Sequence, residues 1–225
     1  MPATDKHPAL GTVVLLHGLG RGPWSMKRIE WTLRRDGYKV HNIGYTSRQC
    51  DIPTLAEQTL GPVFGERPAG DPLHFVTHSM GGILLRQFLT THPNASRPHR
   101  VVMLGPPNRG SEIVDRLRNW PPYAKVNGPA GLQLGTGPES TPNQLAELTG
   151  AEVGIIAGSV SLNPLFSWWI RRPSDGKVSI ESTRLDGMSD HIVLRTSHTW
   201  MMWRGGVVDH IRSFLRDGHF APLGK

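Results

Sequence analysis

Short runs of Val, Ile and Leu recur along this chain, and longer segments with helical spacing lie between them. The runs do not alternate with polar residues, which is typical of strands buried on both faces of a parallel sheet. This rhythm predicts an α/β protein with a mostly parallel sheet and helices on both of its faces. The expected strands are Thr12–Leu16, Tyr38–Ile43, Leu73–Val76, Val101–Leu104, Val153–Ala157 and Ile192–Leu194. The expected helices between them are Trp24–Arg35, Thr54–Glu66 and Gly81–Thr91.

The last part of the chain predicts one more helix. Its apolar residues recur at a spacing that places them on one face, and they are Val207, Val208, Ile211, Phe214 and Leu215. Gly218 follows, and glycine is favoured just after a helix because it adopts positive φ without a steric penalty. We therefore expect the helix to end near Gly218.

Residues 106–150 differ from the rest of the chain. They contain seven prolines and six glycines, and only Ser111–Asn119 and Asn143–Leu148 have helical patterns. Long irregular insertions in compact domains usually form lids or binding loops. We expect a small cap or lid over the sheet, with a merely decorative insertion as the alternative.

Length and composition predict one domain over residues 1–225, since 37% of residues are apolar and 19% are charged. The longest aliphatic run, Val13–Leu16, is far too short to cross a bilayer. Residues 1–10 lack the pattern of a signal peptide. Cys50 is the only cysteine, so no internal disulfide is expected. These features favour a cytoplasmic monomer or small oligomer.

The formal charge of +7 comes from arginines that are scattered rather than clustered. The longest basic runs are the pairs Arg34–Arg35 and Arg171–Arg172. Nucleic-acid binding usually requires clustered basic residues or a recognisable motif, so we expect no nucleic-acid partner. We interpret the charge as solvated surface, and peripheral contact with acidic membranes stays open as an alternative.

One segment predicts a nucleophile. The strand Leu73–Val76 leads through Thr77-His78-Ser79-Met80 directly into a helix. A serine on such a sharp turn projects its hydroxyl above the sheet edge, and small residues two places on either side let the strand and helix approach. Gly81 fills the later place, whereas Thr77 departs from the usual glycine at the earlier one. Ser79 is therefore the candidate nucleophile.

The strand Thr12–Leu16 ends in His17-Gly18-Leu19-Gly20, which predicts an oxyanion hole. An oxyanion hole needs two backbone amides. In the fold where a nucleophilic serine occupies such a turn, the residue after the serine supplies one of them and an upstream loop supplies the other. Met80 and Leu19 are the candidates for these two backbone donors. Each such donor contributes about 3 kcal/mol to an acyl-transfer transition state.

The base should follow the last strand, because the order of the triad in that fold is serine, acid, histidine. His198 lies between Ile192–Leu194 and the closing helix. His191 begins that strand, while His210 and His219 lie in or after the helix. His198 is therefore the candidate general base.

The acid should follow the strand Val153–Ala157, which leaves several carboxylates. Asp175 lies on a turn before Gly176, where it could accept the imidazole N–H while backbone donors hold it in place. Asp186 and Asp190 are competitors, and Glu181 also falls in this interval. Spacing alone does not decide among them.

Five segments in this order carry a family resemblance, and they are Leu15–Gly20, Val76–Gly82, Met103–Ser111, Asp175–Val178 and Thr196–Met202. Over roughly residues 10–217, the chain resembles the bacterial esterase/lipase family of α/β-hydrolase fold that is related to GPI inositol-deacylase-like hydrolases. The resemblance implies the α/β-hydrolase fold, the triad Ser79, Asp175 and His198, and hydrolysis of carboxylic esters. It also favours Asp175 over the other acids.

The expected activity is therefore cleavage of an ester or lipid-like small molecule through an acyl-enzyme. Thioester cleavage, lactone opening and acyl transfer on the same triad are alternatives, as is a non-catalytic binding protein with this fold. No cofactor or metal is expected, since the histidines form no zinc-binding motif. Apolar residues expected near the mouth of the site are Trp120, Tyr123, Leu165, Phe166, Trp168 and Trp169.

Overall fold

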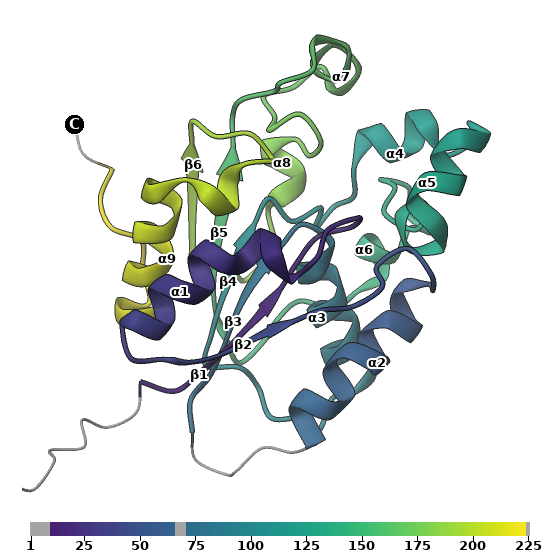
Figure 1. Ribbon diagram of the computed structural model, residues 1–225. Coiled ribbons are helices and arrows are strands. Elements are labelled where there is room, and N and C mark those ends of the chain that lie inside the picture. Colours follow the sequence, from purple (N-terminus) through teal and green to yellow (C-terminus); the bar gives the residue numbers. More distant parts are fainter. Residues whose placement is uncertain (1–9, 66–70, 224–225) are drawn as a thin grey trace, which may run out of the picture.

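The computed structural model describes residues 10–65 and 71–223, in which six parallel strands form one sheet (Figure 1). The order of the strands across the sheet is β2-β1-β3-β4-β5-β6. This arrangement confirms the predicted parallel sheet. The strands are β1 (Thr12–Leu16), β2 (Lys39–Ile43), β3 (Leu73–His78), β4 (Arg100–Leu104), β5 (Glu152–Gly158) and β6 (Asp190–Leu194).

Helices cover both faces of this sheet (Figure 1). The 3₁₀ turn η1 (Pro23–Met26), α1 (Lys27–Arg35) and α9 (Gly205–Asp217) lie on one face, and α2 (Ile52–Gly65) and α3 (Met80–Thr91) lie on the other. The predicted end of α2, Glu66, lies outside the described residues. No helix within the described ranges has the length and apolar character of a bilayer-spanning segment.

Helix α9 forms as predicted. It buries Val207, Val208, Ile211, Phe214 and Leu215. The residue that caps its carboxyl end, Gly218, has φ of +78°, which a glycine adopts without a steric penalty.

Residues 106–150 contain α4 (Glu112–Leu117), α5 (Pro121–Leu132) and α6 (Thr141–Gln144). The helix expected over Ser111–Asn119 is present in a shorter form. The helix expected over Asn143–Leu148 is wrong, because α6 ends at Gln144 and Leu145 is extended. Helix α5 was not predicted, because its prolines and glycines are typical of loops. Pro121 lies in the first turn of this helix, where proline is favoured.

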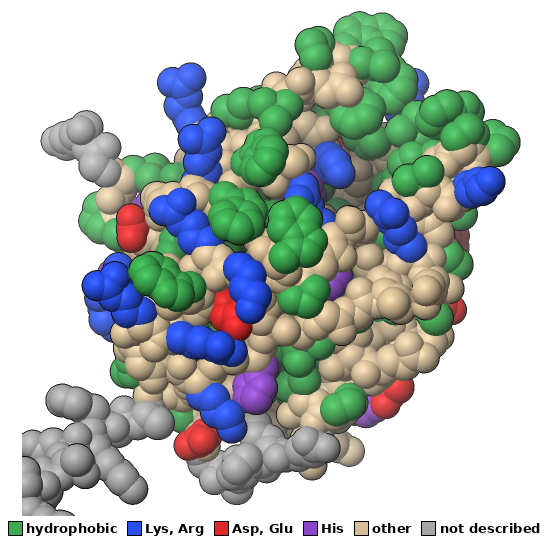
Figure 2. Space-filling view, viewed as in Figure 1, with side chains coloured by type: hydrophobic (Ala, Val, Ile, Leu, Met, Phe, Trp, Pro, Cys, Tyr) green, Lys and Arg blue, Asp and Glu red, His purple; other side chains and the backbone are tan. Residues whose placement is uncertain are grey.

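Two further helices follow β5, namely α7 (Pro164–Ile170) and α8 (Ile180–Thr183), and a 3₁₀ turn, η2 (Met201–Trp203), precedes α9. Helix α7 exposes Leu165 and Trp168. Figure 2 shows hydrophobic side chains gathered over α7 and, across a depression, over α4 and α5. These elements therefore stand above the carboxyl ends of the strands as two apolar walls.

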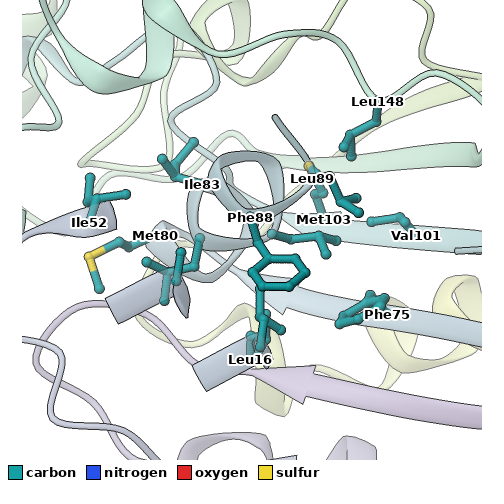
Figure 3. Close-up of a cluster of buried hydrophobic side chains, with 14 of the residues drawn as sticks. Leu16, Ile52, Phe75, Met80, Ile83, Phe88, Leu89, Val101, Met103 and Leu148 are labelled. Carbon is teal, nitrogen blue, oxygen red and sulfur yellow. The ribbon is translucent and has the colours of Figure 1, made fainter. Parts of the chain in front are cut away.

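Two clusters of buried side chains hold the layers together, one on each face of the sheet. Successive strand residues point to opposite faces, so Val13 belongs to one cluster and Val14 to the other. Figure 3 shows the cluster on the α2 and α3 face, where Met80 of α3 and Phe75 of β3 are buried together with Ile52 of α2. The turn between β3 and α3 is therefore held by fully buried side chains that precede and follow it in the chain.

Candidate active site

Ser79 occupies the sharp turn between β3 and α3. Its φ of 53° and ψ of −123° are rare for a residue with a side chain, and such strain is characteristic of a nucleophile elbow. The connection after β1 crosses one face of the sheet, whereas the connection after β3 crosses the other. Ligands bind in the crevice that opens between the carboxyl ends of two such strands. Ser79 lies at that crevice.

Gly81 permits the close approach of α3 to β1. A Cβ at this position would lie 2.7 Å from the Leu16 carbonyl oxygen and 2.9 Å from that of His17, closer than real Cβ contacts. Thr77, which departs from the usual glycine on the other side of the serine, is fully buried at the end of β3. The elbow therefore needs a glycine two positions after Ser79 but accommodates a threonine two positions before it.

The structure brings Ser79, His198 and Asp175 together from three distant parts of the chain. The Ser79 hydroxyl lies 3.0 Å from Nε2 of His198, and Nδ1 of His198 lies 2.7 Å from Oδ2 of Asp175. Both His198 and Asp175 are buried. Because the carboxylate accepts the Nδ1–H, Nε2 is left as the acceptor for the serine hydroxyl.

Backbone groups fix the Asp175 carboxylate. Its Oδ1 accepts hydrogen bonds from the amides of Lys177 at 3.0 Å and Val178 at 2.9 Å. Its own carbonyl accepts the amide of His198 at 3.0 Å. The acid is therefore held by its turn, and only Oδ2 remains to orient the imidazole.

The competing acids lie elsewhere. Asp186 and Glu181 both pair with Arg109 at the surface, at 3.0 and 3.1 Å. Asp190 accepts the amide of Phe220 at 2.8 Å and thereby anchors the segment after α9. Of these four carboxylates the structure places Asp175 beside His198, while the other three make their contacts elsewhere.

Two glycines leave room for the acid and the histidine. A Cβ on Gly105, just after β4, would lie 2.9 Å from Oδ2 of Asp175 and 3.1 Å from Nδ1 of His198. A Cβ on Gly158, at the end of β5, would lie 2.7 Å from the Asp175 Cβ. Sequence reasoning missed this role of Gly105 and Gly158, because both positions look like ordinary ends of strands.

The loop expected to supply one oxyanion donor is held from the β2 side. The His17 ring stacks on the Tyr45 ring with 4.0 Å between the ring centroids. Nε2 of His17 accepts a hydrogen bond from the Tyr45 backbone amide, and the Tyr45 hydroxyl donates one to the His17 carbonyl. The Gly20 amide donates to Ser47 Oγ at 2.9 Å. Burial lowers the pKa of His17 and thus favours its neutral form. Sequence reasoning missed Tyr45 and Ser47, which lie in a separate loop.

Leu19 lies in this loop and lines the same cavity as Ser79, whereas the Met80 side chain is buried in the core. Met80 is the first residue of α3, so its amide has no acceptor within the helix. Leu19 thus lines the cavity at Ser79 and Met80 directly follows Ser79, and the role of their backbone amides as oxyanion donors stays a prediction.

His78 is a further residue that the sequence did not single out. Its Nε2 lies 3.0 Å from the His198 carbonyl oxygen, to which it can donate. Complete burial, and after it the electrostatic interaction with the His198 imidazole, lowers the pKa of His78 well below its usual value. His78 is therefore neutral at physiological pH and supports the loop that carries His198.

A cavity of about 330 Å³ opens at Ser79. Trp120, Tyr123 and Phe166 line it as predicted, whereas Leu165, Trp168 and Trp169 do not. The remaining apolar wall comes mostly from α4, with Ile113, Val114 and Leu117, and from Leu134. Residues 106–150 therefore contribute much of the wall of the site.

Within residues 10–65 and 71–223, no group of three or more histidine, cysteine or acidic side chains is placed to hold a metal ion. The chemistry that the arrangement can perform is nucleophilic attack by a serine whose proton a neighbouring histidine accepts.

No family model and no curated protein sequence matches the chain. Among solved structures, a lipase from Bacillus licheniformis, BlEst2 in its mature form, is similar with a TM-score of 0.70 at 19% identity, over 98% of this chain and 96% of that one. The metagenomic carboxyl esterase MGS0156 gives 0.67 at 18% identity, over 88% and 69%. Phospholipase PlaB from Legionella pneumophila gives 0.60 at 16% identity, over 77% and 45%. The chain therefore has the α/β-hydrolase fold.

Proposed function

We propose that this protein is a serine hydrolase that cleaves carboxylic esters, with Ser79 as nucleophile, His198 as general base and Asp175 as the orienting acid. The observation that carries the proposal is the unbroken chain of contacts from the strained Ser79, at 3.0 Å, through His198 to the buried Asp175, at 2.7 Å. The neighbours named as lipase, carboxyl esterase and phospholipase support ester substrates. The resemblance to GPI inositol-deacylase-like hydrolases remains part of this proposal.

In the proposed mechanism His198 removes the proton of Ser79 as its oxygen attacks the ester carbonyl. The backbone amides of Leu19 and Met80 stabilise the oxyanion that develops. His198 then donates the proton to the departing alcohol, and an acyl-enzyme remains. Asp175 keeps the imidazole in the correct tautomer and stabilises the imidazolium. Water that His198 activates finally releases the acid.

A fluorophosphonate separates this proposal from a binding protein that merely has the fold. We expect the wild-type protein to be labelled rapidly and on Ser79 alone, because phosphonylation requires a serine that a base has activated. Intact-mass and peptide mass spectrometry measure the adduct. Heat-unfolded protein serves as the control. An absence of labelling in folded protein would support the non-catalytic alternative.

Thioester cleavage, lactone opening and acyl transfer would use the same three residues, so they remain alternatives within the proposal. The substrate is a small ester or lipid-like molecule, because the cavity is mostly apolar and contains about 330 Å³. Exposed Leu165 and Trp168 of α7 stand beside the pair Arg171 and Arg172. This pairing of apolar and basic side chains favours peripheral contact with acidic membranes.

We expect catalytic efficiency on p-nitrophenyl esters to rise with acyl length up to medium chains and then fall. Each buried methylene contributes roughly 0.8 kcal/mol until the cavity at Ser79 is full. Initial rates from acetate to palmitate measure the optimum. The cavity holds about 330 Å³, which leaves little room for a long chain.

The modest size of this cavity also predicts little activation of the enzyme at an oil–water interface. Tributyrin and triolein rates, measured across their solubility limits, provide the comparison. A sharp rise above the limit together with a long-chain optimum would identify residues 106–150 as a mobile lid and would contradict a modest fixed cavity.

A further inference from the structure

Two cationic side chains line the cavity that contains Ser79. They are Arg21, from the loop after β1, and Lys177, from the turn that carries Asp175. No aspartate or glutamate is among the residues that line this cavity. Within the described parts of the chain neither cation forms an ion pair. The cavity therefore combines a mostly apolar lining with two positive charges that no carboxylate of the lining neutralises.

Both cations lie on the side of Ser79 that His198 occupies. Arg21 donates from Nη2 to the carbonyl of Thr199, the residue after His198, at 3.3 Å. Lys177 is two residues after Asp175, and its amide is bonded to that carboxylate. Figure 2 shows Lys and Arg side chains in the depression between the apolar groups over α7 and over α4 and α5. A substrate group on this side would meet positive charge.

The pKa shifts of the two cations also favour a bound anion. Desolvation by the surrounding protein lowers the pKa of Lys177, the charge of Arg21 lowers it further, and Asp175 offsets this only in part. Desolvation also lowers the pKa of Arg21. After burial and the interaction with His198, the charges of Arg21 and Lys177 also lower the pKa of His78. A bound anion would relieve the repulsion between these two cations.

His198 passes its proton to the leaving oxygen, so the alcohol part of the ester lies on the His198 side. The apolar side chains that α4 and α5 contribute to the cavity suit an acyl chain. We propose that the alcohol part of the natural ester carries a carboxylate or phosphate that Arg21 and Lys177 bind. This inference rests on the serine hydrolase function proposed above and specifies its substrate class.

The test compares two soluble esters that differ in one anionic group, hexanoyl glycerophosphate and hexanoyl glycerol. The measured quantity is the ratio of kcat/KM for the charged ester to that for the neutral one. We expect the wild-type ratio to exceed about ten, since a hydrogen bond to a charged group is worth at least one order of magnitude in an equilibrium constant. The ratio should fall as salt screens the charges.

Variants assign this preference to the two cations. Lys177→Met and Arg21→Met should each lower the ratio by about tenfold, whereas Lys177→Arg should retain most of it. Lys39→Met is the matched control, because Lys39 is exposed on β2 and pairs with Thr12 at the amino end of the sheet, away from Ser79. It removes the same charge and should leave the ratio unchanged.

A wild-type ratio near one, or ratios that neither Lys177→Met nor Arg21→Met changes, would overturn the inference. If both esters are still cleaved and Ser79 is still labelled by fluorophosphonate, the proposed hydrolase function stands. If neither is cleaved and no label appears, the function itself fails and the inference falls with it. Oleoyl glycerophosphate in micelles adds a second arm: efficient cleavage identifies a lipid headgroup as the anion, and cleavage of the hexanoyl ester alone identifies a soluble phosphorylated alcohol.

Discussion

Ser79→Ala is expected to lower ester hydrolysis by at least about four orders of magnitude while the protein stays folded. Removal of one triad member leaves only the contributions of the oxyanion donors and of substrate binding. The substitution removes one hydroxyl at the cavity surface and leaves the core beneath the elbow intact. The measurements are kcat/KM for p-nitrophenyl butyrate, fluorophosphonate labelling and the thermal unfolding midpoint.

Ser96→Ala is the matched control for this variant. Ser96 is exposed in the segment before β4 and lines no part of the cavity at Ser79. We expect wild-type activity and wild-type labelling. If Ser79→Ala retained more than about a tenth of the activity, the assignment of Ser79 as nucleophile would be wrong, because losses at a triad nucleophile are far larger.

Asp175→Asn is expected to lower turnover by about 10⁴-fold with little loss of stability. The amides of Lys177 and Val178 both donate to Oδ1, so the oxygen of an asparagine side chain would take that place. Its NH₂ group would then face Nδ1 of His198, where Oδ2 now accepts at 2.7 Å. The imidazole would carry its proton on Nε2 instead and could no longer accept the proton of Ser79.

Asp186→Asn and Asp190→Asn provide the comparison in the same assay. Asp186 lies at the surface beside Arg109, so its loss should leave turnover nearly unchanged. Asp190 binds the amide of Phe220, so its loss should reduce stability before it reduces turnover. A larger loss of turnover in Asp190→Asn than in Asp175→Asn, in folded protein, would move the acid to Asp190.

Local patterns predicted the sheet and the serine because each depends on residues that are close in sequence. The strand before Ser79, the glycine after it and the helix that follows form one continuous segment. His198 could be located because it follows the last strand. Asp175 could not be separated from Asp186 and Asp190 by spacing, since all three lie in turns or at the start of a strand, and only the family resemblance favoured it.

Other parts of the site depend on contacts that sequence spacing does not contain. Tyr45 and Ser47 hold the loop after β1, although they follow β2. Gly105 and Gly158 make space for Asp175 from two neighbouring strands. Helix α5 escaped prediction because a proline at the start of a helix and a proline in a loop look alike, and Gly128 interrupts its geometry with φ of 67°. The contacts made by Tyr45, Ser47, Gly105 and Gly158 join residues that are distant in sequence, so only the folded structure shows them.

The order of the strands also has a consequence for folding kinetics. Ser79 follows β3 at the centre of the sheet, whereas Asp175 and His198 follow β5 and β6, which add to one edge. Contacts between residues about a hundred positions apart form slowly, because the chain must close a long loop before they contribute. A chain in which only β1 to β4 have assembled would therefore hold its serine in the elbow without a base. Under the proposed function, hydrolysis would require β5 and β6 to be docked, and the gain of hydrolysis during refolding would report on that step.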